Sequence, residues 1–349
     1  MAPGTPNGST ARDRSKSEIY VRKRFLGETG IEISEVILGC GTFGGVGGET
    51  KLIGRGLDNV AAFATLDEAA SLGINVLDTA ERYAGGSSEL VIGQWLRHGD
   101  EQTRAAMHIA TKVAPPAMDD SKGRAFDQSY IEEKLAISLE RLGIERVTFY
   151  LSHAPDPDTP IETTLEGFAA VVESGRVEHV GCCNVDARQL RAALDASDRL
   201  GLPKFEWVQN SFSLLRPEAD HEVRAICAER NLGYTPFSPL AGGVLTGKYK
   251  RNAPFPDGTR LALRPDGFDR ILSEGVFDAL EQLEVEAIGR DVTCAGLALA
   301  WMLANAHCTA PVVGPSRLAP HLAHVAEATA LALTSEAASQ ISAWFSRAA

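Results

Sequence analysis

Short apolar runs alternate with longer amphipathic segments along almost the whole chain of 349 residues. The apolar runs lie at 35–41, 75–80, 107–113, 147–153, 177–184, 205–212, 233–240 and 309–315. Segments with helical periodicity follow them at 59–73, 87–98, 128–143, 160–175, 186–201, 218–233, 273–290 and 317–329. Apolar strands that alternate with amphipathic helices indicate a parallel sheet covered by helices. Eight such units predict an α/β protein with a closed (β/α)8 TIM barrel, and an open doubly wound sheet is the alternative.

Several features complete this predicted architecture. Residues 21–36 indicate an N-terminal β-hairpin that turns at 28–30, and 291–307 form an extra helix before the last strand. Glycines are expected to end five of the helices: Gly73, Gly143, Gly175, Gly201 and Gly233. Residues 1–20 are polar and rich in Pro, Gly and Ser, which predicts a disordered tail, and 21–349 are expected to form one domain.

Composition and charge limit the classes of binding partner and the cellular compartment that we expect for this chain. The net charge of -12 and the lack of a Lys/Arg stripe argue against nucleic acid or an anionic membrane surface as a partner. No apolar run reaches the roughly 18 residues of a membrane span, and the N-terminus lacks the apolar core of a secretion signal. None of the six cysteines forms a C-x-x-C pair, so we expect reduced thiols in a cytoplasmic protein. The sequence does not indicate an oligomeric state.

Four polar residues of different chemical kinds stand at or just after successive predicted strand ends. Asp78 lies near the end of the second apolar run, Tyr83 comes five residues later, Lys112 is near the end of the third run, and His153 ends the fourth. Singly, each fits an ordinary role in a turn, a cap or a solvated loop. Because barrel enzymes place their chemistry at the C-terminal ends of the strands, together they predict a proton-transfer site.

Carbonyl reduction is the chemistry that uses all four groups. A hydride added to a carbonyl carbon leaves an alkoxide that needs a proton, and Tyr83 can supply it. Lys112 is expected to make the phenol more acidic, Asp78 to hold Lys112, and His153 to orient the carbonyl oxygen. A Schiff base on Lys112, as in some barrel aldolases, is an alternative that does not require Tyr83. A metal site is not expected, since His153 has no second ligand at a metal-binding spacing.

The chain resembles the aldo-keto reductases from about residue 25 to about residue 330. The resemblance is carried by D-T-A-x-x-Y with a downstream S-E (Asp78 to Tyr83, then Ser88 and Glu89), by Lys112 in ATKV, and by His153 in H-x-P-D. It implies NADPH-dependent reduction of an aldehyde or ketone, with Tyr83 as general acid/base. Oxidation of a sugar or other alcohol with NAD(P)+ and a slow, NADPH-binding auxiliary subunit are the alternatives. The substrate itself is not specified.

The resemblance also implies a set of cofactor-binding residues. They are Gly41, Thr42, Cys183, Asn184, Gln209, Phe212, Ser238, Leu240, Gly242, Gly314, Ser316 and Arg317. Cys183 stands where a serine is usual, and Phe212 is expected to stack on the nicotinamide. Arg317 predicts NADP(H), with NAD(H) as the alternative, because a guanidinium matches a 2′-phosphate. Phe43, Tyr83 and His153 are expected to line the substrate pocket.

One glycine motif is rejected as a dinucleotide fingerprint. Gly39, Gly41 and Gly44 spell G-x-G-x-x-G after a strand, but helical periodicity begins only near Asn59. The fingerprint requires a helix that starts at the third glycine, so that the helix N-terminus faces the pyrophosphate. These glycines are therefore predicted to form a loop on the substrate side.

Overall fold

The computed structural model describes residues 21–118, 121–263, 271–315, 317 and 320–348. Eight parallel strands form one sheet in the order β10-β3-β4-β5-β6-β7-β8-β9. They are β3 (Ile37–Gly39), β4 (Val76–Asp78), β5 (His108–Val113), β6 (Val147–Ser152), β7 (Val177–Cys183), β8 (Trp207–Gln209), β9 (Gly233–Tyr234) and β10 (Val312–Val313). Phe237, just after β9, pairs with Val312 of β10, which closes the ring. The predicted barrel is confirmed, whereas the predicted tail lies outside the described residues.

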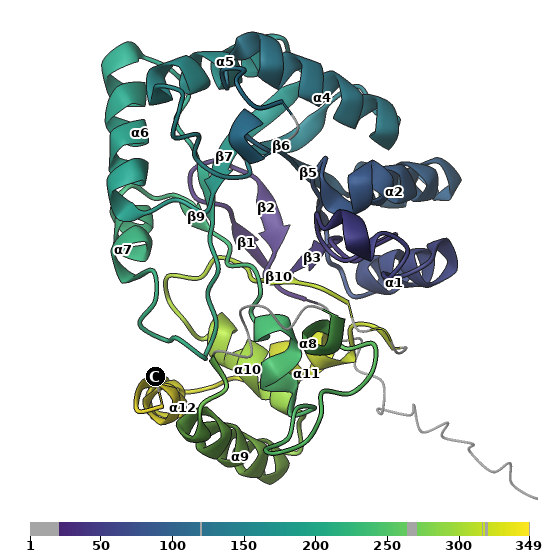
Figure 1. Ribbon diagram of the computed structural model, residues 1–349, viewed down its shortest axis with the longest axis vertical. Coiled ribbons are helices and arrows are strands. Elements are labelled where there is room, and N and C mark those ends of the chain that lie inside the picture. The colour runs from purple at the N-terminus through teal and green to yellow at the C-terminus, as the bar shows by residue number, and fades with distance from the viewer. Residues whose placement is uncertain (1–20, 119–120, 264–270, 316, 318–319, 349) are drawn as a thin grey trace, which may run out of the picture.

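Helices surround the barrel, as Figure 1 shows. They are α1 (Asn59–Ser71), α2 (Ser87–His98), α3 (Glu101–Ala105), α4 (Gln128–Leu142), α5 (Ile161–Glu173), α6 (Ala187–Leu200), α7 (His221–Glu229), α8 (Arg260–Leu263), α9 (Glu274–Gly289), α10 (Cys294–Leu303), α11 (Ala323–Ala330) and α12 (Ser335–Ser346). α10 is the predicted extra helix. Our sequence reasoning did not predict α12, although Thr334 caps its N-terminus by accepting from the Ala337 N–H at 3.2 Å.

The predicted hairpin is confirmed and covers one end of the barrel. β1 (Lys23–Phe25) pairs antiparallel with β2 (Glu32–Ser34), and the fully buried Leu26 and Ile33 pack with the barrel interior. Gly233, predicted to end α7, instead begins β9, and a Cβ there would lie 2.2 Å from a methyl group of Leu26. The left-handed position after α7 belongs to Asn231 (φ 51°). Gly233 thus serves the packing of the hairpin and not a helix cap.

The barrel interior changes from apolar to polar toward the C-terminal strand ends. Val76, Ala110, Leu151 and Trp207 belong to one buried interior cluster. Side chains two positions apart share a face of a strand. Asp78, Lys112, His153 and Gln209 each stand two residues farther along, so they form the next interior layer. The fold therefore collects these polar groups at one mouth of the barrel.

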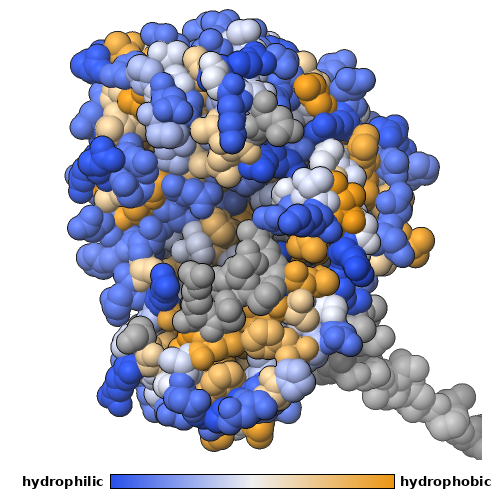
Figure 2. Space-filling model, in the orientation of Figure 1, coloured by the Kyte–Doolittle hydropathy of each residue, from blue (hydrophilic) through white to orange (hydrophobic). Residues whose placement is uncertain are grey.

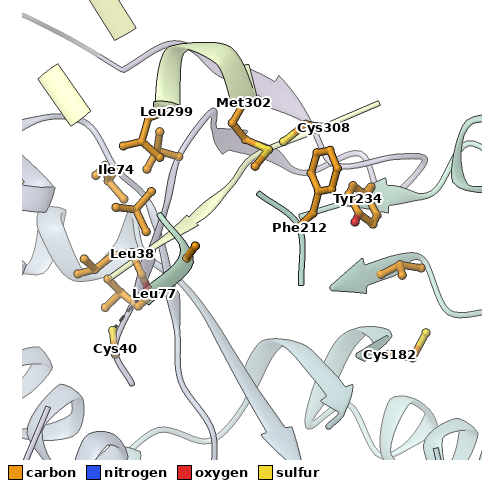
Figure 3. Packing of buried hydrophobic residues seen from close by; sticks show 14 of the residues in the cluster. Leu38, Cys40, Ile74, Leu77, Cys182, Phe212, Tyr234, Leu299, Met302 and Cys308 are labelled. Atoms are coloured by element: carbon orange, nitrogen blue, oxygen red, sulfur yellow. Dashed lines mark hydrogen bonds between the residues drawn. The ribbon is translucent and has the colours of Figure 1, made fainter. Parts of the chain in front are cut away.

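A second, larger cluster fills the space between barrel and helices. Figure 3 shows part of it, where Leu38 and Leu77 lie near Ile74 and Cys40, and Phe212 lies beside Tyr234. All six cysteines are buried and free, as expected. Within the described part of the chain, no helix is both long enough and apolar enough to cross a bilayer.

Candidate active site

A buried ion pair between neighbouring strands is the centre of the site. The Lys112 ammonium donates to Asp78 at 2.8 Å and to the Thr79 carbonyl at 2.8 Å. Only 1% of the Lys112 side chain and 3% of the Asp78 side chain are exposed. Burial alone would lower the pKa of Lys112, but the attraction of Asp78 and Tyr83 outweighs it and raises the pKa above its ordinary value. Lys112 therefore carries a positive charge at any physiological pH.

Tyr83 lies over this ion pair from the loop after β4. Its phenol oxygen is 3.4 Å from the Lys112 nitrogen, which is 5.0 Å from the ring centroid. The chain leaves Tyr83 through three consecutive left-handed residues, Ala84, Gly85 and Gly86. A non-glycine residue such as Ala84 is uncommon in that region and persists only when its surroundings fix it.

The S-E part of the motif provides those surroundings. Ser88 donates to the Cys40 carbonyl at 2.9 Å, and the buried Glu89 accepts from Thr111 at 2.7 Å and from Arg141 at 3.1 Å. Arg141 also donates to the Glu81 carbonyl at 3.1 Å, and its guanidinium occupies the place of a Cβ at Gly86. Ser88 and Glu89 thus hold the loop that carries Tyr83 and do not themselves reach the reacting groups.

His153 completes the group directly after β6. Its ring lies edge-on to Tyr83 with centroids 5.7 Å apart, and its Nδ1 is buried without a partner among the described residues. Burial, assisted by the charges of Lys112 and Arg82, lowers the pKa of His153 to about 3. The imidazole is therefore neutral at physiological pH. The four predicted catalytic side chains do come together.

The direction of the Tyr83 shift differs from our expectation. Burial raises the pKa of the phenol to about 12, although the Lys112 charge acts in the opposite direction. Lys112 lowers the pKa of the phenol, as expected, but burial outweighs this effect and the net pKa is higher than that of free tyrosine. Lys112 limits the rise without reversing it, and Tyr83 stays protonated at neutral pH.

Three predicted cofactor residues lie beside this group, at the ends of β7 and β8. Gln209 donates to Asp78 at 3.1 Å, and the exposed Asn184 donates to the backbone carbonyl of His153 at 2.8 Å. Cys183 is buried, and burial raises the pKa of its thiol to about 12, so it is a neutral and weak donor.

A hydrogen-bond chain that we did not predict supports Asn184. Asn184 has a left-handed backbone (φ 57°). The N–H of the next residue, Val185, donates to the Asn210 side-chain oxygen at 3.1 Å, and the Asn210 amide nitrogen donates to the Val185 carbonyl at 2.7 Å. Asp220 accepts from Asn210 at 3.1 Å and from Tyr234 at 2.8 Å. A buried asparagine whose amide is held on several sides fixes the backbone that it contacts. The only sequence signal was the adjacency of Asn210 to Gln209.

Phe212 is not placed to stack on a nicotinamide. Its ring packs 5.6 Å from Trp301 and 6.5 Å from Tyr234, and only 1% of the residue is exposed. Figure 3 shows it beside Tyr234, on the side of Met302 and Cys308, and it belongs to the cluster between barrel and helices. Phe237 is the better candidate, because it packs against the interior cluster and pairs with both Ser211 and Val312 at the mouth. Phe237 therefore replaces Phe212 as the candidate for this contact.

The glycine-rich loop after β3 packs around the Tyr83 loop. As expected, the following helix begins only at Asn59, capped by Asp58. Gly41 faces Tyr83, and a Cβ added at Gly41 would lie 3.6 Å from the nearest atom of the Tyr83 ring. Thr42 has a buried hydroxyl without a partner among the described residues, which makes it available to a ligand. Phe43 is fully buried in the hydrophobic core, which argues against its predicted place in the substrate pocket.

The loop after β9 offers backbone groups and an unpaired cation. Ser238, Ala241, Gly242 and Gly243 all have left-handed backbones, and Leu240 is partly buried among them. The Lys248 ammonium lies over Gly243, 2.8 Å from where a Cβ would be, and no ion pair with a described residue satisfies it. Burial lowers the pKa of Lys248. Such curled backbone and a lysine are features of anion sites, and we had not predicted Lys248.

Beyond β10, Gly314 and Arg317 are exposed, while Ser316 lies outside the described residues. Arg317 donates to the Gly258 carbonyl at 3.0 Å, which joins it to the insertion after β9.

Figure 2 shows a hollow near the centre of the face in view. In the described residues, no three His, Cys, Asp or Glu side chains gather as metal ligands would.

Comparison with known proteins places this chain in a family. The family model for the aldo/keto reductase family matches residues 35–344. The uncharacterized oxidoreductase YrpG of Bacillus subtilis is 34% identical over 83% of this chain and 86% of its own length. A probable voltage-gated potassium channel subunit beta of Arabidopsis thaliana is 30% identical over 84% and 86%. The NADH-specific methylglyoxal reductase of Escherichia coli is 31% identical over 81% and 86%.

Proposed function

This chain belongs to the aldo/keto reductase family of oxidoreductases, and we propose that it reduces an aldehyde or ketone with NADPH, Tyr83 donating the proton. The observation that carries the proposal is the arrangement around one opening of a protonated phenol, a buried ammonium and a neutral imidazole. When bound, NADPH supplies the hydride to the carbonyl carbon.

The protonation states divide the work between Tyr83 and His153. The pKa of Tyr83 is raised to about 12, so the phenol carries its proton at neutral pH and can give it to the developing alkoxide. His153 cannot be the acid, because its pKa is lowered to about 3 and the ring is already neutral. A neutral imidazole can still donate one N–H to the carbonyl oxygen and hold it beside the phenol.

Lys112 stabilises the phenolate that remains after proton transfer. Its ammonium lies 3.4 Å from the phenol oxygen and is held by Asp78 at 2.8 Å. A positive charge at this distance in a buried site favours the phenolate strongly. Asp78 keeps the ammonium charged and fixes its position.

The same geometry argues against a Schiff base on Lys112. That chemistry requires a neutral, accessible amine. Here the pKa of Lys112 is raised and the side chain is 1% exposed. Its ammonium also donates hydrogen bonds to the Asp78 carboxylate and to the Thr79 carbonyl. We therefore prefer the reductase over the aldolase alternative.

The described residues fit a nicotinamide dinucleotide along one side of the mouth. Asn184 and Gln209 can hold the carboxamide, Phe237 can contact the nicotinamide ring, and Thr42 has a buried hydroxyl free to bond. Lys248 and the left-handed loop at Ser238–Gly243 can hold the pyrophosphate. Cys183 and Leu240 would contribute packing at this side.

Arg317 favours NADPH over NADH in this proposal. Its guanidinium is exposed, and among the described residues it bonds to one backbone carbonyl alone, so a 2′-phosphate can recruit it. The family does not decide the question, since the Escherichia coli relative is named NADH-specific.

A second candidate function follows from the Arabidopsis relative, whose name is that of a channel subunit. A subunit that binds NADPH without useful turnover would keep the same barrel. The intact set of Tyr83, Lys112, Asp78 and His153 favours an enzyme instead. Oxidation of an alcohol with NADP+ uses the same groups in reverse.

The test is a turnover screen of the purified protein. NADPH and NADH are each supplied with aldehydes, ketones and keto-sugars, and NADP+ with alcohols, while absorbance of the reduced nicotinamide is followed. We expect carbonyl-dependent oxidation of NADPH with multiple turnovers. Tight binding of NADPH, seen by fluorescence, without more than one turnover on any substrate would support the auxiliary subunit instead.

A further inference from the structure

Arg82 is a cation at the mouth that the reaction described above does not use. It directly precedes Tyr83 and is partly buried between the Tyr83 loop and the glycine-rich loop. Its Nε lies 3.8 Å from where a Cβ of Gly48 would stand, so the absence of a side chain at Gly48 leaves room for the guanidinium. Among the described residues, Arg82 has neither an ion pair nor a side-chain hydrogen bond.

The two carboxylates that closely precede Arg82 in the chain, Asp78 and Glu81, are bonded to other groups. Glu81 accepts from the Ala114 N–H at 2.8 Å and lies 3.6 Å from Lys134. Asp78 is bonded to Lys112 and Gln209. Neither compensates Arg82. A partly buried and unpaired guanidinium costs free energy unless a ligand supplies the opposite charge.

The charge of Arg82 reaches the reacting groups. After burial and Lys112, it is the third cause of the lowered pKa of His153. Arg82 therefore lies close enough to act on a molecule whose carbonyl oxygen is held by Tyr83 and His153. The charge of Lys112 is matched by Asp78. Arg82 therefore supplies an unmatched positive charge beside Tyr83 and His153.

We infer that the preferred substrate carries a carboxylate, which Arg82 binds while the carbonyl oxygen lies between Tyr83 and His153. This inference rests on the proposed reductase function. A guanidinium pairs with a carboxylate through two parallel N–H bonds. A carboxylate offers two coplanar oxygens and a single negative charge, which one guanidinium can match completely. Arg82 is thus a specificity-determining residue for an oxo-acid or aldehyde-acid.

The test compares matched substrates that differ in one charge. 4-Carboxybenzaldehyde and its methyl ester form one pair, and succinic semialdehyde and its methyl ester form a second, shorter pair. We expect kcat/KM with NADPH to be at least about tenfold higher for the acid in one pair, since charge-assisted hydrogen bonds are among the stronger ones. Arg82→Gln should reduce this ratio about tenfold or more, and Arg82→Lys should retain part of it.

Arg55→Gln is the matched control, because Arg55 is exposed on the glycine-rich loop against which Arg82 packs. It should change the acid-to-ester ratio less than about twofold by long-range charge alone. Equal acid and ester rates in the wild type, or equal loss with both substrates in R82Q, would overturn the inference while leaving the reductase function intact.

A binding measurement covers the case in which no carbonyl compound is reduced. Benzoate and benzamide are titrated calorimetrically into the protein saturated with NADP+. We expect benzoate to bind more tightly, and R82Q to remove the difference. If turnover fails but this difference is seen, the reductase proposal fails and the carboxylate site stands. Equal binding of the two ligands refutes the site.

Discussion

The proton-transfer side and the cofactor side of the mouth differ in how far they are assembled before anything binds. On the side of β4 and β5, Asp78, Lys112 and Tyr83 of the loop after β4 satisfy one another within 3.4 Å. On the side of β9 and β10, Lys248 lacks an ion pair among the described residues and Arg317 holds only a backbone carbonyl. Catalytic groups are most effective when they are preorganised, whereas groups that bind a ligand must keep bonds to offer.

The largest expected effect is on the assembled side, at Tyr83. Tyr83→Phe removes the proton donor and keeps the ring, so kcat for carbonyl reduction should fall by roughly 10² to 10⁴. The dissociation constant for NADPH, measured by fluorescence titration, should change little. A variant that retains wild-type kcat would remove Tyr83 from the mechanism.

Lys112→Met tests the ion pair itself. It leaves the buried Asp78 carboxylate with Gln209 as its one side-chain donor in the described part of the chain, and breaking such a pair costs about 3–5 kcal/mol of stability. Urea denaturation should show this loss. Asp78→Asn in the same chain should restore part of it, because the unpaired charge is gone. No recovery in the double variant would mean that the pair contributes packing alone.

Asn210→Ala should weaken the link between the two sides. It removes the bonds that hold Val185, so the neighbouring Asn184 loses its fixed backbone. We expect NADPH to bind about tenfold more weakly, and 2′-phospho-ADP-ribose, which lacks the nicotinamide, to bind within about twofold of wild type. Equal weakening of both ligands would reduce Asn210 to a general structural role.

Asn75→Ala is the matched control for that variant. Asn75 is also buried and bonded to backbone, at Ser34 and Glu32, but it lies by the hairpin at the other end of the barrel. Its loss should lower stability without changing the ratio of the two ligand affinities.

The smallest expected effect is at Arg317. Arg317→Ala should raise the dissociation constant of NADPH about five- to tenfold, because one exposed charged contact to a phosphate is lost. NADH is the internal control and should bind as before. A similar loss for NADH would contradict a contact with the 2′-phosphate.

The sequence predicted the assembled side better than the cofactor side, for a physical reason. Asp78, Lys112 and His153 are fixed by their places at strand ends, which follow from strand periodicity alone. Phe212 was assigned wrongly because it stands an odd number of residues after Gln209 and so faces the outer helices. Phe237 stands two residues after Thr235, which accepts a hydrogen bond from the interior Trp207. The two side chains therefore share the inward face. Alternation would have distinguished the two aromatic residues.

The features of the site that sequence reasoning missed depend on contacts between residues far apart in the chain and on burial. The chain Asn210–Asp220–Tyr234 joins residues from separate segments, and no local pattern indicates it. The rise in the pKa of Tyr83 depends on how deeply the phenol is buried, which the order of residues does not reveal. The motif named residues that the structure brings together, but it did not indicate how strongly burial acts on the phenol.

The pH dependence of the reaction in both directions tests the central claim most directly. The pKa of Tyr83 is raised to about 12, so its protonated form dominates below that pH and its phenolate grows about tenfold per pH unit. His153, with a pKa near 3, stays neutral throughout. We predict that kcat/KM for reduction is level between about pH 6 and 9, and that alcohol oxidation rises steadily over the same range. A reduction rate that falls with rising pH through about 6.5, the ordinary histidine range, would make His153 the acid and contradict this account.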